Sequence, residues 1–251
     1  MTASAWLDAA WIEADWPPIA GVRAGCSTRL GGVSTAPYDS LNLAEHVGDD
    51  PERVAANRQR LAEALALPSS PHWLDQVHGT VCLNLDAERS EAPADASFSR
   101  QGRVCAVMTA DCLPVLIAAR NGSAAAAVHA GWRGLQAGVI ERALEALATP
   151  PEQLQVWLGP MIGPAAFEVG SEVVAAFTAD DAGAARCFMA ANRAGHWMAD
   201  LPGLARRRLR ACGVDAVFGG DLCTYSDAAC FFSYRRDGPC GRMVSLIWQS
   251  K

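Results

Sequence analysis

The sequence predicts an α+β protein built on mixed β-sheets. Short apolar runs of strand length alternate irregularly with segments that carry a helical pattern. Several of these runs are joined by turn residues, which indicates hairpins rather than the regular strand–helix–strand order of a parallel sheet. The chain shows no repeat, low-complexity segment or linker, so we expect one domain over residues 1–251.

The N-terminal third is expected to contain strands, a polar loop and one helix. Residues 1–25 predict short strands interrupted by a pair of prolines, and a polar loop with two adjacent glycines follows over 27–34. Asp50 before Pro51 predicts the start of a helix, because an acidic N-cap followed by proline is typical of helix N-termini. An apolar stripe continues this helix toward Pro68.

The middle of the chain is dominated by short apolar runs. We expect strands at 73–77, 81–85, 104–108, 113–118 and 124–129. Asn121-Gly122 lies between the last two runs and is a strong hairpin signal. A helix with an alanine and leucine face is expected over 135–147, because Pro150 and Pro151 end the pattern.

The C-terminal part again mixes both kinds of element. We expect a strand at 155–158, a helix introduced by 167–170, a helix from Asp200 to Arg210 and a closing strand at 242–248.

Composition narrows the function classes. The formal charge of −6 and the pI near 5.4 argue against a nucleic-acid partner held by a basic face. No apolar run approaches the roughly 20 residues that span a bilayer, and the start lacks the basic and apolar regions of a signal peptide. The nine cysteines are scattered and form no C-x-x-C pair, so a reducing cytoplasm is the expected setting.

Three motifs concentrate reactive side chains at predicted strand ends. They are Gln76-Val77-His78-Gly79, Thr109-Ala110-Asp111-Cys112-Leu113-Pro114 and His129-Ala130-Gly131-Trp132-Arg133-Gly134. Imidazole and thiolate are the ligands that Zn²⁺ prefers, and three protein ligands with an open fourth position are typical of a catalytic site. The separations of 34 residues (78 to 112) and 17 residues (112 to 129) match no local zinc-finger spacing, so the hypothesis depends on convergence of strand ends.

In this hypothesis a metal ion is held by His78, Cys112 and His129. It would keep the cysteine as thiolate and acidify a bound water. Asp111 is expected to orient one of the imidazoles.

Other interpretations of the same residues stay open. Cys112 is also compatible with a nucleophile, with His129 or His78 as its base and backbone N–H groups as an oxyanion hole. Each of the three residues also has a purely structural interpretation. A further alternative is a non-enzymatic binding module that uses the same pocket. We assign structural roles to His46, His72, His196 and the other eight cysteines, with Cys223 the least clear of them.

Seven motifs in a fixed order resemble those of one known family. They are Ser27-Thr28-Arg29 with Gly31-Gly32-Val33-Ser34, Gln76-Val77-His78-Gly79, Ala110-Asp111-Cys112-Leu113-Pro114, His129-Ala130-Gly131-Trp132-Arg133-Gly134, Gly159-Pro160 with Ile162-Gly163, Phe167-Glu168-Val169-Gly170 and Phe232-Ser233-Tyr234-Arg235-Arg236-Asp237. The chain is similar, from about Gly25 to Trp248, to the YfiH or laccase-domain family, first labelled multicopper polyphenol oxidoreductases and now described as purine nucleoside phosphorylases. One departure is the run 94–99, where relatives carry an Asp-Ala-Leu-Val/Ile-Thr-like sequence; we expect little functional effect.

The resemblance implies a fold, a site and an activity. The fold would be two mixed sheets packed together and flanked by helices, related to a toxin deamidase catalytic domain, with a zinc site at His78, Cys112 and His129. The activity would be phosphorolysis of adenosine, inosine, guanosine and methylthioadenosine, together with adenosine deamination. Bacterial relatives are also linked to editing of peptidoglycan precursors, which makes a cysteine amidohydrolase using Cys112 the alternative.

Phosphorolysis needs an anion cradle as well as the metal site. Arg29 beside Gly31-Gly32 is the first choice, since glycines let backbone N–H groups reach an anion. Further candidates are Arg133 and Arg235 for phosphate, Ser34 and Asn42 for ribose or base, and Asp111 as proton shuttle in deamination. Tyr38, Trp132 and Phe232 have the faces to stack on a purine, but core packing is the expected role of each.

The laccase label itself conflicts with the histidine content. A multicopper oxidase builds a trinuclear cluster and a blue-copper site mainly from imidazoles, and five histidines cannot supply that set. Zinc is therefore the expected cofactor and copper the less favoured one. The expected partners are a purine nucleoside and phosphate, with neither nucleic acid nor membrane.

Overall fold

The computed structural model describes residues 3–87 and 92–250. The α-helices are α1 (Ala3–Ala10), α2 (Pro51–Leu65), α3 (Trp132–Ala137), α4 (Val139–Leu147), α5 (Ser171–Asp180), α6 (Leu201–Ala211) and α7 (Tyr234–Asp237), with short 3-10 helices η1 (Pro151–Gln153) and η2 (Ala182–Cys187). The strands are β1 (Trp11–Glu13), β2 (Val22–Ser27), β3 (Cys82–Asn84), β4 (Ala96–Ser99), β5 (Cys105–Thr109), β6 (Leu113–Ala119), β7 (Ala125–Ala130), β8 (Leu154–Leu158), β9 (Glu168–Gly170), β10 (Phe188–Ala190), β11 (His196–Ala199), β12 (Val217–Gly219) and β13 (Met243–Gln249).

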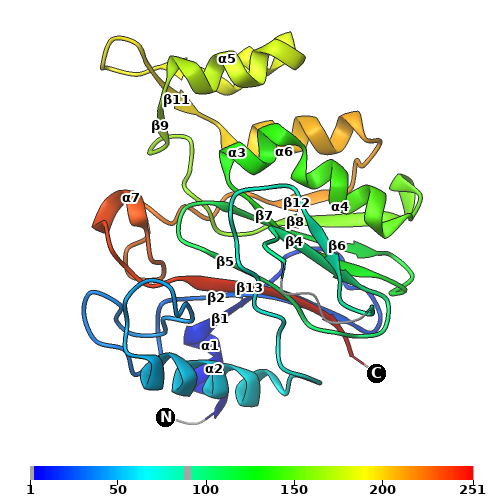
Figure 1. The fold of residues 1–251 in the computed structure, drawn as a ribbon, viewed down its shortest axis with the longest axis vertical. Coiled ribbons are helices and arrows are strands. Elements are labelled where there is room, and N and C mark those ends of the chain that lie inside the picture. Colours follow the sequence, from blue (N-terminus) through cyan, green and yellow to red (C-terminus); the bar gives the residue numbers. More distant parts are fainter. Residues whose placement is uncertain (1–2, 88–91, 251) are drawn as a thin grey trace.

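These elements stack in four layers (Figure 1). Helices α1 and α2 cover one face of a four-stranded antiparallel sheet of order β1-β2-β13-β5. Its other face packs on a six-stranded mixed sheet of order β12-β8-β6-β7-β4-β3, which α3, α4 and α6 cover on the far side. The predicted α+β class, with packed sheets and flanking helices, is confirmed.

Strand β6 shows how alternation builds these layers. Val115 and Ile117 face the helices α3, α4 and α6, whereas Leu116 and Ala118 face the other sheet. Side chains of a strand alternate between its two faces, so a strand buried on both faces has an uninterrupted apolar sequence. This is why 113–118 reads as a continuous apolar run.

Helix α2 follows its sequence signal closely. The Asp50 side chain accepts a hydrogen bond from the backbone N–H of Glu52, and Pro51 occupies the first helical position. The apolar stripe is buried through Val54, Leu61 and Leu65. The helix ends at a left-handed C-cap before Pro68 is reached.

Three local expectations were wrong. Residues 3–10 form helix α1 rather than a strand, because an alanine-rich segment with Trp6 and Leu7 packed on the core satisfies a helix better. Residues 73–77 form no strand. The helix expected over 135–147 starts earlier and is split into α3 and α4 at Gly138, whose φ of 96° interrupts the helix.

A third, three-stranded sheet of order β10-β11-β9 was not expected. Together with α5 it projects from the helical side, at the top of Figure 1. Its strands have three or four residues each, too short to give a clear periodic pattern. Among the helices of the described chain, none combines the length and apolar character required to cross a bilayer.

Candidate metal centre and active site

His78, Cys112 and His129 converge, as their motifs predicted. One ligand atom of each lies within 4.8 Å of those of the other two. The Sγ of Cys112 is 3.7 Å from Nε2 of His78, and the two imidazole rings meet edge to face with centroids 4.8 Å apart. The strand register explains the meeting of Cys112 and His129: Leu113 at the start of β6 pairs with Ala130 at the end of β7.

The backbone is strained at His78 and at Asp111, the residue before Cys112. Their φ angles are 61° and 88°, a left-handed conformation that residues other than glycine rarely adopt. Such residues each cost roughly 1–3 kcal/mol and concentrate at functional sites. The conformation places His78 at a sharp turn before β3 and Asp111 at the turn between β5 and β6.

Asp95 is the residue that organises the centre, and the sequence analysis did not select it. Its carboxylate is fully buried and accepts a 2.7 Å hydrogen bond from Nδ1 of His129. It also accepts bonds from the backbone N–H groups of Val77, His78 and Gly79, at 3.2, 2.9 and 2.6 Å. One carboxylate therefore fixes both the His129 ring and the loop that carries His78, and it leaves Nε2 of His129 directed away from Asp95.

Asp111 was expected to orient one of the imidazoles, and this prediction was wrong. Its Oδ1 accepts from the Thr224 hydroxyl at 2.6 Å and its Oδ2 from the backbone N–H of Arg235 at 2.7 Å. The imidazole partner is Asp95, 34 residues before His129 and at the head of β4. Asp95 lies just before β4, and no local sequence signal marks it as the partner of His129.

The electrostatics of the metal-free centre favour a thiolate. Burial alone would raise the pKa of Cys112, but the positive charge of His129 and hydrogen bonds from both histidines outweigh burial and lower it to about 6. Burial likewise opposes protonation of His129, whereas the Cys112 thiolate and Asp95 raise the pKa of His129 to about 9. Asp95 also has a lowered pKa, because bonds from His129 and the backbone overcome its burial.

The donor types suit a tetrahedral zinc ion with an open position, and the spacing of Cys112 and His78 matches such a site. Zinc–sulfur and zinc–nitrogen bonds of about 2.3 Å and about 2.0–2.1 Å place the two donors about 3.6 Å apart at a tetrahedral angle. The separation of Cys112 Sγ and His78 Nε2 is 3.7 Å. Gly131 leaves the room for this approach, since a Cβ there would lie 2.7 Å from Cδ2 of His78 and 3.1 Å from Sγ of Cys112.

Gly131→Ala is expected to weaken metal binding at least tenfold while the protein stays folded. Gly131 has a φ of −62°, which any residue adopts, so the added methyl group acts only by displacing His78 and Cys112. Zinc affinity measured by competition with a chromogenic chelator tests this. Gly79→Ala is the matched control, because its Cβ would meet no atom closer than 3.5 Å. Equal zinc affinity of the two variants would contradict the steric argument.

Gln76 ties the His78 loop to β5, the edge strand of the four-stranded sheet. Its side-chain amide donates to the carbonyl of Met108 at 2.8 Å and accepts from the backbone N–H of Met108 at 2.7 Å. A side chain thus pairs with β5 as a neighbouring strand would. A second link is a parallel bridge between His72 and Cys105.

The three ligands line a cavity of about 540 Å³. Asp111, Arg133 and Arg235 also line it, as does His46, to which the sequence analysis gave a structural role. Its remaining walls are formed by Gln76, Met108, Thr109, Ala110, Ile162, Phe167, Tyr234 and Arg242. The pKa of His46 is lowered, first by burial and then by Arg242.

The other predicted binding residues do not line this cavity. The Arg29 guanidinium bonds to the Asp39 carbonyl and carboxylate and to the carbonyl of Ala228, and it lies over the ring of Phe232. Ser34 and Asn42 are buried and both donate to the carboxylate of Asp49. Their polar atoms are thus engaged within the protein.

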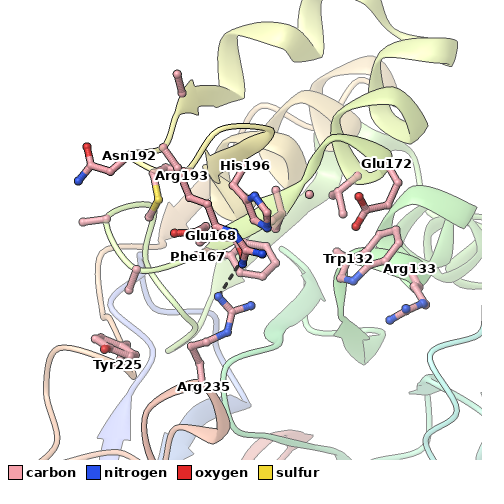
Figure 2. Close-up of a pocket in the computed structure, with 18 residues that line it drawn as sticks. Trp132, Arg133, Phe167, Glu168, Glu172, Asn192, Arg193, His196, Tyr225 and Arg235 are labelled. Carbon is pink, nitrogen blue, oxygen red and sulfur yellow. Dashed lines mark hydrogen bonds between the residues drawn. The ribbon is translucent and has the colours of Figure 1, made fainter.

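Of the three candidate stacking residues, one is in the core, one lines a cavity and Tyr38 does neither. Phe232 is fully buried in the core between the sheets, and the Tyr38 hydroxyl donates to the carbonyl of Val47. Trp132 lies instead on a second cavity of about 940 Å³ (Figure 2). All nine cysteines fall within the described residues and are free thiols.

The second cavity adjoins the first. Arg133, Phe167 and Arg235 line both, so the two spaces meet at these side chains. Figure 2 shows the imidazole of His196 hanging into the second cavity above the Phe167 ring. The small third sheet, which was not predicted, and helix α5, which was, provide most of its far wall.

Comparison with known proteins places these residues in a family context. The chain is 54% identical over 239 residues to "Purine nucleoside phosphorylase YfiH" of Escherichia coli strain K12, covering 94% of this chain and 98% of that protein. It is also 54% identical over 240 residues to "Purine nucleoside phosphorylase PA4543" of Pseudomonas aeruginosa, covering 95% of this chain and 98% of that one.

Solved structures agree over nearly the whole chain. The crystal structure of Neisseria meningitidis protein NMB0706 matches with a TM-score of 0.92 and 47% identity, covering 96% of this chain and 99% of that one. YlmD from Geobacillus stearothermophilus matches with a TM-score of 0.89 and 31% identity, covering 96% and 97%. The model of the family described as multi-copper polyphenol oxidoreductase laccase matches residues 23–250. The chain therefore belongs to this family, whose members include the YfiH proteins.

Proposed function

We propose that the protein is a purine nucleoside phosphorylase whose activity depends on a metal ion bound by His78, Cys112 and His129. The convergence of these three side chains on the wall of a cavity carries the proposal. The cavity volume of about 540 Å³ falls in the usual range for small-molecule sites. Relatives named purine nucleoside phosphorylase, at 54% identity, supply the reaction class.

Zinc is the metal that we propose. Two imidazoles and one thiolate form a borderline-soft, three-ligand set that leaves one position free. A bound zinc ion would supply a Lewis acid toward a purine substituent or a water molecule. The Asp95 carboxylate would orient His129 and hold the His78 loop in the metal-bound protein as it does here.

Phosphate must reach C1′ of the ribose while the purine departs with a proton. Arg133 and Arg235 stand at the junction of the two cavities and are the proposed phosphate ligands. Asp111 fixes Arg235 by accepting its backbone N–H. Among the described residues that line the first cavity, Asp111 is the one carboxylate, and we propose it as the proton shuttle when adenosine is deaminated.

The proposed substrates are adenosine, inosine, guanosine and methylthioadenosine, with adenosine deamination as a second reaction of the same site. Phosphate and a purine nucleoside are the expected partners. Free thiols at all nine cysteines support a reducing compartment, and we infer the cytoplasm.

A nucleoside panel with and without phosphate tests this function. Purified protein should release adenine from adenosine only when phosphate is present, and ribose 1-phosphate should form in equal amount. A chelator should remove the activity, and zinc should restore it, because the thiolate and imidazoles alone supply no Lewis acid. Adenine release without phosphate would instead indicate a hydrolase.

The cysteine amidohydrolase remains the second candidate, because the lowered pKa of Cys112 beside His78 and His129 also suits a nucleophile. The names of the relatives do not favour it. An acyl-thioester trapped on Cys112, with turnover that resists chelation, would replace the phosphorylase proposal by this one.

A further inference from the structure

The second cavity contains three arginine side chains that lack acidic partners. Arg133, Arg193 and Arg235 line it, and within the described residues none of them forms an ion pair. Within the part of the chain that the structure describes, eight other arginines pair with acids, so unpaired arginines are not the rule there. In a protein of net charge −6, three unpaired guanidinium groups around one cavity form a local positive site.

Two of these guanidinium groups are held by aromatic rings. Arg133 lies over Trp132 at 4.4 Å from the ring centroid, and Arg235 over Phe167 at 5.6 Å. Stacking uses the face of the guanidinium plane and leaves the in-plane N–H donors available. Arg235 donates one hydrogen bond to the backbone carbonyl of Glu168, which fixes the side chain but does not neutralise its positive charge.

Arg193 approaches from the opposite wall. It lies between β10 and β11, and Figure 2 shows its side chain directed toward that of Arg235, which comes from α7. No hydrogen bond of the described chain occupies its guanidinium group. Two cations that face one another without a carboxylate between them are suited to share an anion.

The acidic residues of the cavity do not cancel this charge. The carboxylate of Glu172 folds back on Gly170, where a Cβ would lie 2.1 Å from Oε2. It belongs to the first turn of α5, where the helix dipole favours an acid. With Glu168, the cavity has two acids against three arginines.

We propose that the second cavity is a phosphate-binding subsite, in which Arg193 and Arg235, with Arg133 at the junction, hold a phosphate group. Planar guanidinium groups bind phosphate oxygens through paired, charge-assisted hydrogen bonds. The group can come from the 5′ end of a nucleoside 5′-phosphate whose base lies in the first cavity, or from inorganic phosphate. The nucleoside half of this inference rests on the proposed function; the phosphate half does not.

Calorimetric titration of the metal-replete protein tests the subsite without turnover. The probes are adenosine 5′-monophosphate, adenosine and inorganic phosphate, each added alone in phosphate-free buffer. Arg193→Ala should weaken binding of the phosphate-bearing probe about tenfold or more, because a charge-assisted bond is lost, while adenosine binds as before. Arg193→Lys should recover part of the loss, since it keeps the charge but not the paired donors.

Arg186→Ala is the matched control. Arg186 is an exposed arginine of η2, on the same side of the molecule, and lines neither cavity. The Arg186→Ala variant should bind every probe with the affinity of the parent protein. Loss confined to adenosine 5′-monophosphate assigns the subsite to a 5′-phosphate, and loss confined to inorganic phosphate assigns it to the co-substrate. Unchanged binding of both by Arg193→Ala, or an equal loss in Arg186→Ala, overturns the proposal.

The outcome separates this inference from the proposed function. A protein that cleaves no nucleoside but binds phosphate through Arg193 would refute the phosphorylase and keep the subsite. If the protein is an active phosphorylase but Arg193→Ala leaves its affinities for phosphate and for adenosine 5′-monophosphate unchanged, only the subsite is refuted.

Discussion

Replacing Cys112 with alanine is expected to abolish phosphate-dependent adenine release and to leave the purified protein without its metal ion. Cys112 supplies the anionic ligand of the trio, and its thiolate lies 3.7 Å from Nε2 of His78. The loss of activity should exceed the roughly 10–100-fold effect of removing an outer-shell partner of a metal ligand. Element analysis of the variant and a discontinuous adenine assay measure the two effects.

Cys212→Ala provides the control for this variant. Cys212 is a free, half-buried thiol at the C-cap of α6 and lines neither cavity. It should retain both metal and activity. If Cys112→Ala kept its metal and its rate, the trio would not be the catalytic centre.

Asp95→Ala is expected to damage stability and metal affinity together. The substitution leaves three backbone N–H groups and Nδ1 of His129 without their buried acceptor. The free energy of unfolding should fall by about 3–5 kcal/mol, as when one partner of a buried charged pair is removed. Zinc affinity should fall about 10–100-fold. Urea unfolding of the chelated protein isolates the first effect, and zinc competition at low denaturant isolates the second.

Asp49→Ala distinguishes the two effects. Asp49 is also a buried carboxylate with several donors, from Ser34, Asn42 and the backbone of Asp50, but none of these lines the metal cavity. It should destabilise the protein without changing zinc affinity. A zinc affinity for Asp95→Ala equal to that of Asp49→Ala would show that His129 needs no orienting partner.

The convergence of His78, Cys112 and His129 was predictable because its signals are local. Glycine or proline within two residues of each histidine or cysteine marks a turn beside an apolar run, and strand ends of one sheet meet. Asp50 and Pro51 likewise predict the start of α2 from two adjacent residues. Such signals are local because they reflect the backbone conformations that individual residue types prefer.

Residues that act across the fold were not predictable in this way. Asp95 accepts a hydrogen bond from His129 because β4 pairs with β7, and no residue near Asp95 in the sequence predicts that pairing. Arg29 and Ser34 sit in a glycine-rich loop of the kind that cradles anions, yet their polar atoms are taken up by Asp39 and Asp49. Whether a polar side chain is free or satisfied depends on the tertiary structure.

The pairing of the Gln76 amide with Met108 has a consequence for self-association. Strand β5 ends its sheet, and an uncovered terminal strand invites pairing with another molecule and aggregation. The Gln76 side chain and the bridge between His72 and Cys105 occupy that border, so the loop that carries His78 also shields the sheet from foreign strands. Loosening this loop would therefore expose the edge of the sheet to other molecules as well as displace His78.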